Sequence, residues 1–183
     1  MPATSRPLLH QTWFNALRTL LYASAFVILF TWLALTVRAF DRHFFFALPH
    51  SLAPLGVVLM LAGGIVGVTC IATFIVRGRG TPALFDPPTQ FVAVGPYRWV
   101  RNPMYIGGFT LLLCFAIYLR SVSILLMVLA LAPACHLLVV LHEEPSLKRK
   151  FGADYENYLR AVSRWLPRAP CTFANNHSGQ VAP

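Results

Sequence analysis

The sequence predicts an all-α integral membrane protein with about four transmembrane helices. Of its 183 residues, 57% are hydrophobic and 11% are charged, and the mean hydropathy is +0.62. Soluble domains carry about 25% charged residues, so this composition excludes an ordinary soluble domain. The uncharged runs are long enough for spans, since about 20 helical residues cross the hydrocarbon core of a bilayer. These runs cover residues 19–37, 43–76, 102–119 and 121–142.

The boundaries of the predicted helices follow from those runs. We predict transmembrane helices over residues 17–37, 53–76, 104–119 and 121–141. The third is short, and only Arg120 and Ser121 separate it from the fourth, so the last two form a tight C-terminal helical hairpin. Residues 1–16 are polar and are predicted to be mobile. The apolar core of the first span is too long for a cleavable signal peptide.

The net charge of +9 is distributed unevenly along the chain. With four spans, both termini and the loop between the second and third spans lie on one side of the membrane. That side carries twelve of the 15 lysines and arginines. The positive-inside rule then makes both termini cytoplasmic, in what we expect to be a bacterial inner membrane. Because these charges flank spans instead of forming a stripe, no nucleic-acid partner is predicted.

Three regions differ in composition. Residues 1–76 form an N-terminal region with two transmembrane helices, residues 77–168 form a core of cytoplasmic loop, helical hairpin and amphipathic tail helix, and residues 169–183 form a disordered tail. The loop over 77–103 combines helix-breaking prolines and glycines with several apolar side chains. Long loops of this kind are often functional, so we expect it to cover the cytoplasmic mouth as a lid.

The tail after Glu144 has the pattern of an amphipathic helix. Basic residues Lys148, Arg149 and Lys150 lie opposite apolar side chains that recur at helical spacing, namely Leu147, Phe151, Tyr155, Tyr158, Leu159 and Val162. Basic residues beside an aromatic face suit the anionic surface of a bilayer, so membrane lipids are an expected partner. Gly152 interrupts the pattern, which fits two short helices as well as one.

Two polar clusters lie at the ends of the predicted hairpin. Arg98 and Arg101 precede its first helix, and Glu143 and Glu144 close its second. Arginine is suited to binding a carboxylate or a phosphate, and a carboxylate at a membrane boundary is costly unless it is paired. Adjacent helical residues point about 100° apart, so one glutamate can bind a ligand while the other pairs with Arg101 or faces water. A purely structural Arg–Glu latch between loop and hairpin fits the same residues.

No metal site is predicted, because the sequence lacks the clustered His, Cys or carboxylate ligands that one needs. Cys70, Cys114, Cys135 and Cys171 form no Cys-x-x-Cys pair, and three of them fall within predicted spans, where cysteine behaves as a small apolar residue. We therefore expect neither zinc nor a disulfide.

One longer pattern resembles a known family. It comprises Gly95-Pro96-Tyr97, the run Arg101-Asn102-Pro103-Met104-Tyr105-Ile106-Gly107, and Glu143-Glu144 followed by Leu147, Phe151-Gly152, Tyr155, Tyr158 and Pro167. In order and spacing this pattern resembles the isoprenylcysteine carboxyl methyltransferase family, with its related bacterial membrane methyltransferases and, more distantly, the phospholipid N-methyltransferases. The likeness covers about residues 78–168, which would make this region a methyltransferase core.

The resemblance implies S-adenosylmethionine as cofactor, bound without a Rossmann domain between the last hairpin, the loop before it and the tail. The phospholipid enzymes need the second glutamate of the pair, so Glu144, together with Arg101, is assigned a catalytic role. The implied acceptor is a small lipophilic molecule with a carboxylate, thiol or amine, and the oligomeric state is left open. The family's cofactor-binding positions correspond, in chain order, to Gln90, Phe91, Val92, Tyr97, Asn102, Pro103, Met104, Tyr105 and Glu143.

The chain departs from the family pattern at two positions. Asn102 stands where the family has the histidine of a His-Pro-x-Tyr segment, and an amide can donate and accept hydrogen bonds but cannot titrate near neutral pH. Val139 stands four residues before Glu143, where prenylcysteine-specific members carry an arginine for the substrate carboxylate. The second departure argues against carboxyl methylation of prenylcysteine and leaves cofactor binding expected.

Two other functions fit parts of the pattern. Membrane sterol and enone reductases use a similar terminal hairpin to hold NADPH, but they would need further basic residues for the 2′-phosphate and a proton-donating tyrosine near the acceptor. A non-catalytic membrane scaffold would have no cofactor affinity. The Glu143-Glu144 pair favours a methyltransferase over both.

Overall fold

The computed structural model describes residues 6–73, 75–76 and 93–167, and this part of the chain contains helices and no strands. All the η elements named below are short 3-10 turns except η5, which is a π-helical turn. The all-α prediction is therefore confirmed for the described residues. The elements, in chain order, are α1 (Arg6–Arg38), η1 (Ala39–His43), η2 (His50–Leu52), α2 (Ala53–Thr73), η4 (Gly95–Arg98), α3 (Pro103–Tyr118), α4 (Val122–Leu138), η5 (Val139–Glu143) and α5 (Glu144–Ala161).

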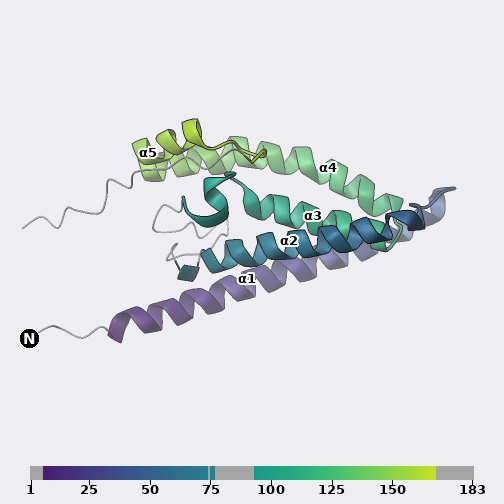
Figure 1. The fold of residues 1–183 in the computed structure, drawn as a ribbon, viewed down its shortest axis with the longest axis horizontal. Coiled ribbons are helices and arrows are strands. Elements are labelled where there is room, and N and C mark those ends of the chain that lie inside the picture. The colour runs from purple at the N-terminus through teal and green to yellow at the C-terminus, as the bar shows by residue number, and fades with distance from the viewer. Residues whose placement is uncertain (1–5, 74, 77–92, 168–183) are drawn as a thin grey trace, which may run out of the picture.

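Helices α1 to α4 lie lengthwise in one elongated bundle, and the start of α1 lies at the same end as α5 (Figure 1). Three stretches are long and apolar enough to cross a membrane: Ala16–His43, His50–Thr73 and Val122–Ala161. Helix α3 is apolar but has 16 residues, or about 24 Å of helix, against a hydrocarbon core of about 30 Å. The chain is thus a membrane protein in which the predicted third span is the short one.

The N-terminal region differs from the prediction. Helix α1 begins at Arg6, so residues 6–16 are helical and the predicted start of the first helix at residue 17 is wrong. Hydropathy marks the part of a helix that lipid can surround, and it does not mark where the backbone hydrogen bonds begin. The predicted lid between residues 77 and 92 and the predicted disordered tail lie outside the described residues.

Helices α2 and α3 pack closely because glycines face each other at their contact. A Cβ atom added to Gly63 would lie 3.0 Å from the carbonyl oxygen of Gly107. One added to Gly107 would lie 3.2 Å from Val66 Cγ1 and 3.3 Å from the Gly63 oxygen. Two backbones in direct contact gain van der Waals attraction, which drives helix association where lipid tails remove the hydrophobic advantage. This contact fixes the start of α3 beside α2.

The end of the bundle away from α5 is closed by contacts between two turns. Helix α3 ends at Tyr118, and Arg120 in the turn after it has a φ of 54°, which is unfavourable for a non-glycine residue. Its side chain donates from Nε to the Leu48 oxygen at 2.9 Å, which helps to offset that cost. Asp41, in η1, accepts a hydrogen bond from the backbone N–H of Ser123 at 2.9 Å, in the first turn of α4. The α1–α2 connection therefore holds the α3–α4 turn.

At the opposite end, η4 and α5 pack on each other. Tyr158 donates its hydroxyl to the backbone oxygen of Tyr97 at 2.7 Å. The apolar face of α5 forms a small core in which Tyr155, Tyr158 and Val162 are at most 3% exposed. The protein itself therefore covers these three residues of the face that we expected to lie on the bilayer surface, while contact of the tail with membrane lipids stays a prediction. The basic run 148–150 is exposed.

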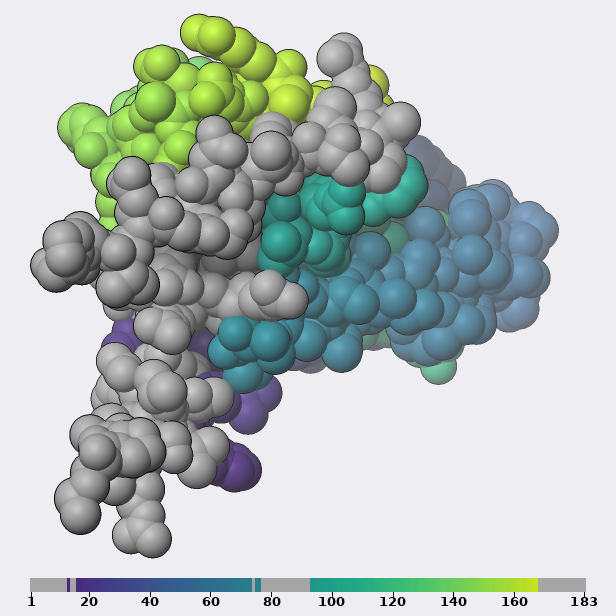
Figure 2. Space-filling view, turned by 60° about the vertical axis from the view of Figure 1, so that its left-hand side comes forward, coloured from purple at the N-terminus to yellow at the C-terminus, as the bar shows by residue number. Residues whose placement is uncertain are grey.

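Helix α5 consists of two short helices joined at Gly152, one of the two predicted alternatives. This residue has φ 53° and ψ −128°, a conformation open to glycine because it has no Cβ atom. The break turns the second half of α5 toward η4. In the space-filling view, the teal start of α3 lies between the yellow-green α5 region and the blue flank of α2 (Figure 2).

Filling the α2–α3 contact should destabilise the fold. In Gly107→Val the new side chain meets the α2 backbone, and we expect a loss of about 1–3 kcal/mol in unfolding free energy. The matched control is Gly108→Val, because a Cβ atom at Gly108 meets nothing within 4 Å. Thermal unfolding can be followed by the reaction of buried Cys70 and Cys114 with a thiol-reactive fluorophore. Equal melting temperatures for the two variants would contradict this packing argument.

Candidate functional site

Helix α4 widens into the π-helical turn η5 where the predicted glutamates lie. Glu143 ends this turn and Glu144 begins α5. Turns of this kind are rare and are found frequently at functional sites. The two consecutive carboxylates have different partners: Glu143 meets α3, whereas Glu144 meets two arginines from other segments. The expected division of the pair is thus observed, and Glu144 is the member that pairs with Arg101.

The Glu143 carboxylate is half-buried where α4 leaves the bundle. Tyr105, in the first turn of α3, donates its hydroxyl to Oε1 of this carboxylate. Among the residues that the structure describes, Oε2 has no donor. A carboxylate withdrawn from water is costly unless cations or further donors compensate it. Glu143 therefore presents an anionic oxygen at the mouth of the α3–α4 hairpin.

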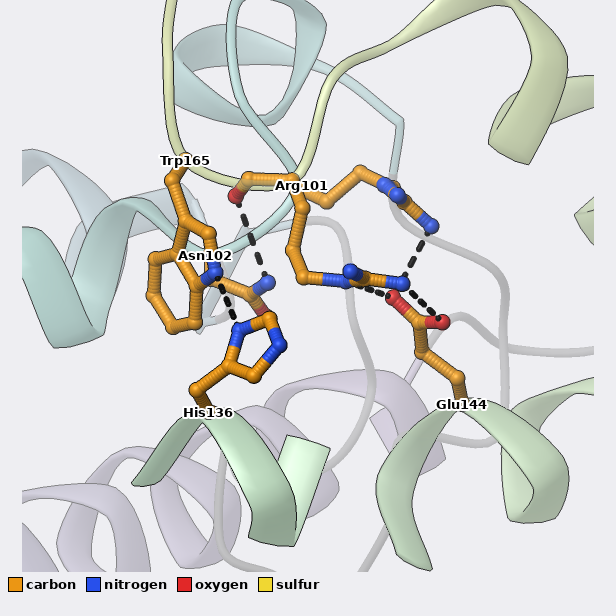
Figure 3. A network of polar contacts seen from close by, with 6 residues as sticks. Arg101, Asn102, His136, Glu144 and Trp165 are labelled. Carbon is orange, nitrogen blue, oxygen red and sulfur yellow. Dashed lines mark hydrogen bonds and ion pairs between the residues drawn. The ribbon is translucent and has the colours of Figure 1, made fainter. Parts of the chain in front are cut away.

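Glu144 is held by two guanidinium groups (Figure 3). Arg101 Nη1 lies 2.9 Å from Oε1, while Arg164 approaches side-on with Nε 2.8 Å from Oε1 and Nη2 3.0 Å from Oε2. The side chains of Arg101 and Glu144 are 11% and 12% exposed, so these charge-assisted bonds form in a largely water-free setting. Donation to Glu144 raises the pKa of the Arg164 guanidinium above its ordinary value. This is the geometry of the predicted Arg–Glu latch.

The same neighbourhood fixes residues 163–167, which follow α5 and which we call the C-terminal strap. The backbone N–H of Arg101 donates to the Ser163 oxygen at 2.9 Å. Asn102 Nδ2 donates to the Arg164 oxygen at 3.3 Å (Figure 3). The amide at position 102 therefore holds the strap against the start of α3.

Trp165 brings an aromatic ring from the strap to the α3–α4 hairpin. Its Nε1 donates to Nδ1 of His136, in α4, at 2.9 Å (Figure 3). The indole also meets the Tyr105 ring edge-on, with centroids 6.2 Å apart and planes at 80°. Tyr105, which holds Glu143, is therefore flanked by an aromatic surface built from three segments of the chain.

Comparison with known proteins identifies the family to which this arrangement belongs. A family model described as phospholipid methyltransferase matches residues 52–154, which is more than half of the chain. The chain belongs to the phospholipid methyltransferase family. This family is part of the isoprenylcysteine carboxyl methyltransferase-like group of membrane methyltransferases, as the resemblance implied. Comparisons with curated proteins and with solved structures find no match.

Sequence reasoning missed three residues of the site in this methyltransferase: His136, Arg164 and Trp165. In the sequence, His136 is a single polar residue within an apolar span, where a helix-packing role is the simpler interpretation. Arg164 and Trp165 follow the tail helix and have no helical spacing to the hairpin. The available signal was a cation next to an aromatic residue immediately before Leu166-Pro167, where a helix has to end.

Several predicted cofactor residues lie beneath the site and support it. Tyr97 is 8% exposed and packs with Cys70 of α2 and with Met104. Pro103 is buried at the first position of α3, where proline is well suited to start a helix. Burial raises the pKa of Tyr97 well above its ordinary value, so its phenol stays neutral. The predicted strip Gln90, Phe91 and Val92 lies outside the described residues.

Candidate bases and metal ligands are few in the described part of the chain. His142, which the sequence offers as a possible base, is exposed and directly precedes Glu143 in the chain. No group of three or more His, Cys, Asp or Glu side chains that could hold a metal occurs among the described residues. Cys70, Cys114 and Cys135 are free thiols.

Removing the Glu144 carboxylate should release the C-terminal strap. In Glu144→Ala two partly buried guanidinium groups lose their shared counter-ion, and we expect a loss of about 3 kcal/mol in unfolding free energy. Trypsin should then cleave faster after Arg164, which mass spectrometry of the fragments measures. The control is Glu156→Ala, which removes an exposed carboxylate of the same helix. Cleavage at the wild-type rate in Glu144→Ala would mean that the ion pairs do not hold the strap.

Proposed function

We propose that this chain transfers a methyl group from S-adenosylmethionine to a lipophilic acceptor at the cytoplasmic boundary of a membrane. The observation that carries the proposal is the half-buried Glu143 carboxylate, bound through one oxygen by Tyr105. It offers an anionic position for a cationic ligand between α3, α4 and the C-terminal strap. Family membership supports the reaction class and argues against the reductase and scaffold alternatives.

The residues present fit this cofactor. Glu143 would hold its ammonium group, since the second carboxylate oxygen has no donor within the described part of the chain. The faces of Trp165 and Tyr105 would hold its sulfonium by cation–π contact. Arg101, paired with Glu144, would hold the start of α3 beside the bound cofactor. A carboxylate and two aromatic faces are thus gathered around one turn.

Methyl transfer from a sulfonium depends on alignment more than on acid–base chemistry. The bound cofactor supplies an electrophilic methyl group, which passes to a lone pair of the acceptor while the carbon–sulfur bond breaks. The task of the chain is to hold the reacting atoms in line about 3–3.5 Å apart and to exclude water. The Glu144 network serves this task by fixing the end of α4, the start of α3 and the strap. Arg101 and Glu144 therefore act in this proposal as positioning residues.

The position of the site also fits its proposed ligands. The end of the bundle that carries the site also carries most of the basic residues in the described part of the chain, which supports a cytoplasmic location in a bacterial inner membrane. A boundary site can be reached by a water-soluble cofactor from one side and by a lipophilic acceptor from the other. A carboxylate or thiolate acceptor needs no base, whereas an amine has to lose a proton.

Removing either partner of the Tyr105–Glu143 contact should weaken cofactor binding. We expect Glu143→Ala and Tyr105→Ala each to lower the affinity for S-adenosylmethionine at least about tenfold, or about 1.4 kcal/mol. Isothermal titration of the purified protein measures this, with Glu156→Ala as the control. Wild-type affinity in a folded Glu143→Ala protein would mean that this glutamate only joins α3 to α4. Binding of NADPH without S-adenosylmethionine would overturn the proposed reaction.

Prenylcysteine should be a poor acceptor. Val139, at the position of the family's substrate-binding arginine, is 1% exposed, so that turn offers an apolar side chain to its neighbours. We expect little transfer of a tritiated methyl group to N-acetyl-S-farnesylcysteine by membranes that contain the wild-type protein. Val139→Arg should increase this transfer if the variant folds, because an arginine–carboxylate contact is charge-assisted. Efficient turnover by the wild type would instead identify Arg98 or Arg101 as the partner of that carboxylate.

A further inference from the structure

His136 is a half-buried polar residue in α4 that the cofactor site, as described above, does not use. It precedes Glu143 by seven residues, or about 10 Å along a helix axis. Since α4 runs from the far side of the membrane toward Glu143, His136 lies on the membrane side of that carboxylate. A lipophilic acceptor that reaches the site from the bilayer would meet this part of α4.

The contact with Trp165 fixes the tautomer of the His136 ring. An indole N–H can only donate, so Nδ1 of His136 has to accept with its lone pair. While Nδ1 accepts in this way, the ring carries its proton on Nε2. In this state Nε2 is a donor and cannot act as a base. The hydrogen bond from Trp165 to Nδ1 therefore makes Nε2, on the other edge of the ring, a hydrogen-bond donor.

That other edge is available to a ligand. Figure 3 shows the far side of the imidazole directed away from Trp165, toward the side on which Arg101 and Glu144 lie. Among the described residues, Nε2 of His136 has no hydrogen-bond partner. This N–H is therefore a donor to which an oxygen atom of a ligand can bind.

We propose that His136 donates from Nε2 to an oxygen atom of the methyl acceptor, next to the atom that is methylated. This inference rests on the proposed function and narrows its substrate class. It favours acceptors whose polar end carries a carboxylate or phosphate oxygen over plain alkyl thiols and alkyl amines. The oxygen is the nucleophile itself in a carboxylate and a neighbouring anchor in a phosphate-bearing amine. The residue orients the acceptor and exchanges no proton with it.

Nitrogen NMR of protein labelled with ¹⁵N-histidine tests the contact directly. The His136 signals are assigned by comparison with His136→Gln, and the free protein should show a proton on Nε2 and none on Nδ1. Four probes are added to the protein saturated with S-adenosylhomocysteine: dodecanoate, dihexanoyl phosphatidylethanolamine, dodecanethiol and dodecylamine. We expect the Nε2–H signal to shift with dodecanoate or with the phosphatidylethanolamine, and with neither oxygen-free probe. Which of the two oxygen-bearing probes shifts the signal tells whether the acceptor oxygen belongs to a carboxylate or to a phosphate.

The outcomes separate this inference from the proposed function. Failure of the wild type to bind S-adenosylhomocysteine, measured by calorimetry, overturns the proposed function. A protein that binds it but shows no His136 response to any probe, or shows the proton on Nδ1, overturns the role of His136 alone. A response to the oxygen-free probes equal to that of the oxygen-bearing ones also overturns it.

Kinetics distinguish an acceptor contact from a merely structural role. A site that donates to an acceptor oxygen discriminates against analogues that lack it. With the oxygen-bearing probe that shifts the NMR signal, we expect His136→Ala to raise the acceptor KM about tenfold with a smaller change in kcat. His136→Gln keeps an N–H donor, so its acceptor KM should lie between those of the wild type and His136→Ala. An unchanged acceptor KM in His136→Ala, or no recovery in a folded His136→Gln, contradicts the proposal.

Discussion

The Glu144 carboxylate joins three segments that are far apart in the sequence, and the arrangement of the functional end depends on this junction. Arg101 comes from the turn before α3, Glu144 is the first residue of α5, and Arg164 comes from the strap after α5. A charge at a membrane boundary has to be compensated, so each of these groups requires the others. The backbone bond from Arg101 to Ser163 and the side-chain bond from Asn102 reinforce the junction. The walls of the site are thereby fixed relative to one another before any ligand binds.

The neighbouring carboxylate, Glu143, takes no part in this junction and contacts Tyr105 instead. Two consecutive glutamates on a regular helix could not both face the same partner, and here they face different ones. The π-helical turn lies where the apolar part of α4 meets this pair, so the helix geometry changes where apolar packing residues give way to charged residues. Farther along α4 toward the bilayer, Trp165 holds His136 in one tautomer. In our proposal, the order along the helix is thus a donor to the acceptor oxygen, a carboxylate that binds the cofactor's ammonium group and a structural ion pair.

Much of this architecture could be predicted from the sequence, and the remainder could not, for identifiable reasons. Runs without charge located the helices because lipid tolerates few charges, and the cluster from Arg101 to Tyr105 stood out because arginine and asparagine are unusual at the start of such a run. The periodicity of α5 predicted an apolar face but could not tell whether lipid or protein covers it. The contacts of Trp165 depend on the direction that the chain takes after Gly152, and a sequence pattern does not encode that direction.

The central claim is that S-adenosylmethionine binds between the start of α3, the end of α4 and the C-terminal strap. The most direct measurement is ultraviolet cross-linking of the protein with methyl-labelled S-adenosylmethionine, followed by mass-spectrometric mapping of the labelled peptides. The account predicts label on peptides containing Tyr105 or Trp165, competed away by unlabelled S-adenosylhomocysteine. Label confined to the far end of the bundle, around Phe44 to Phe46, or label that excess S-adenosylhomocysteine does not displace, would contradict it.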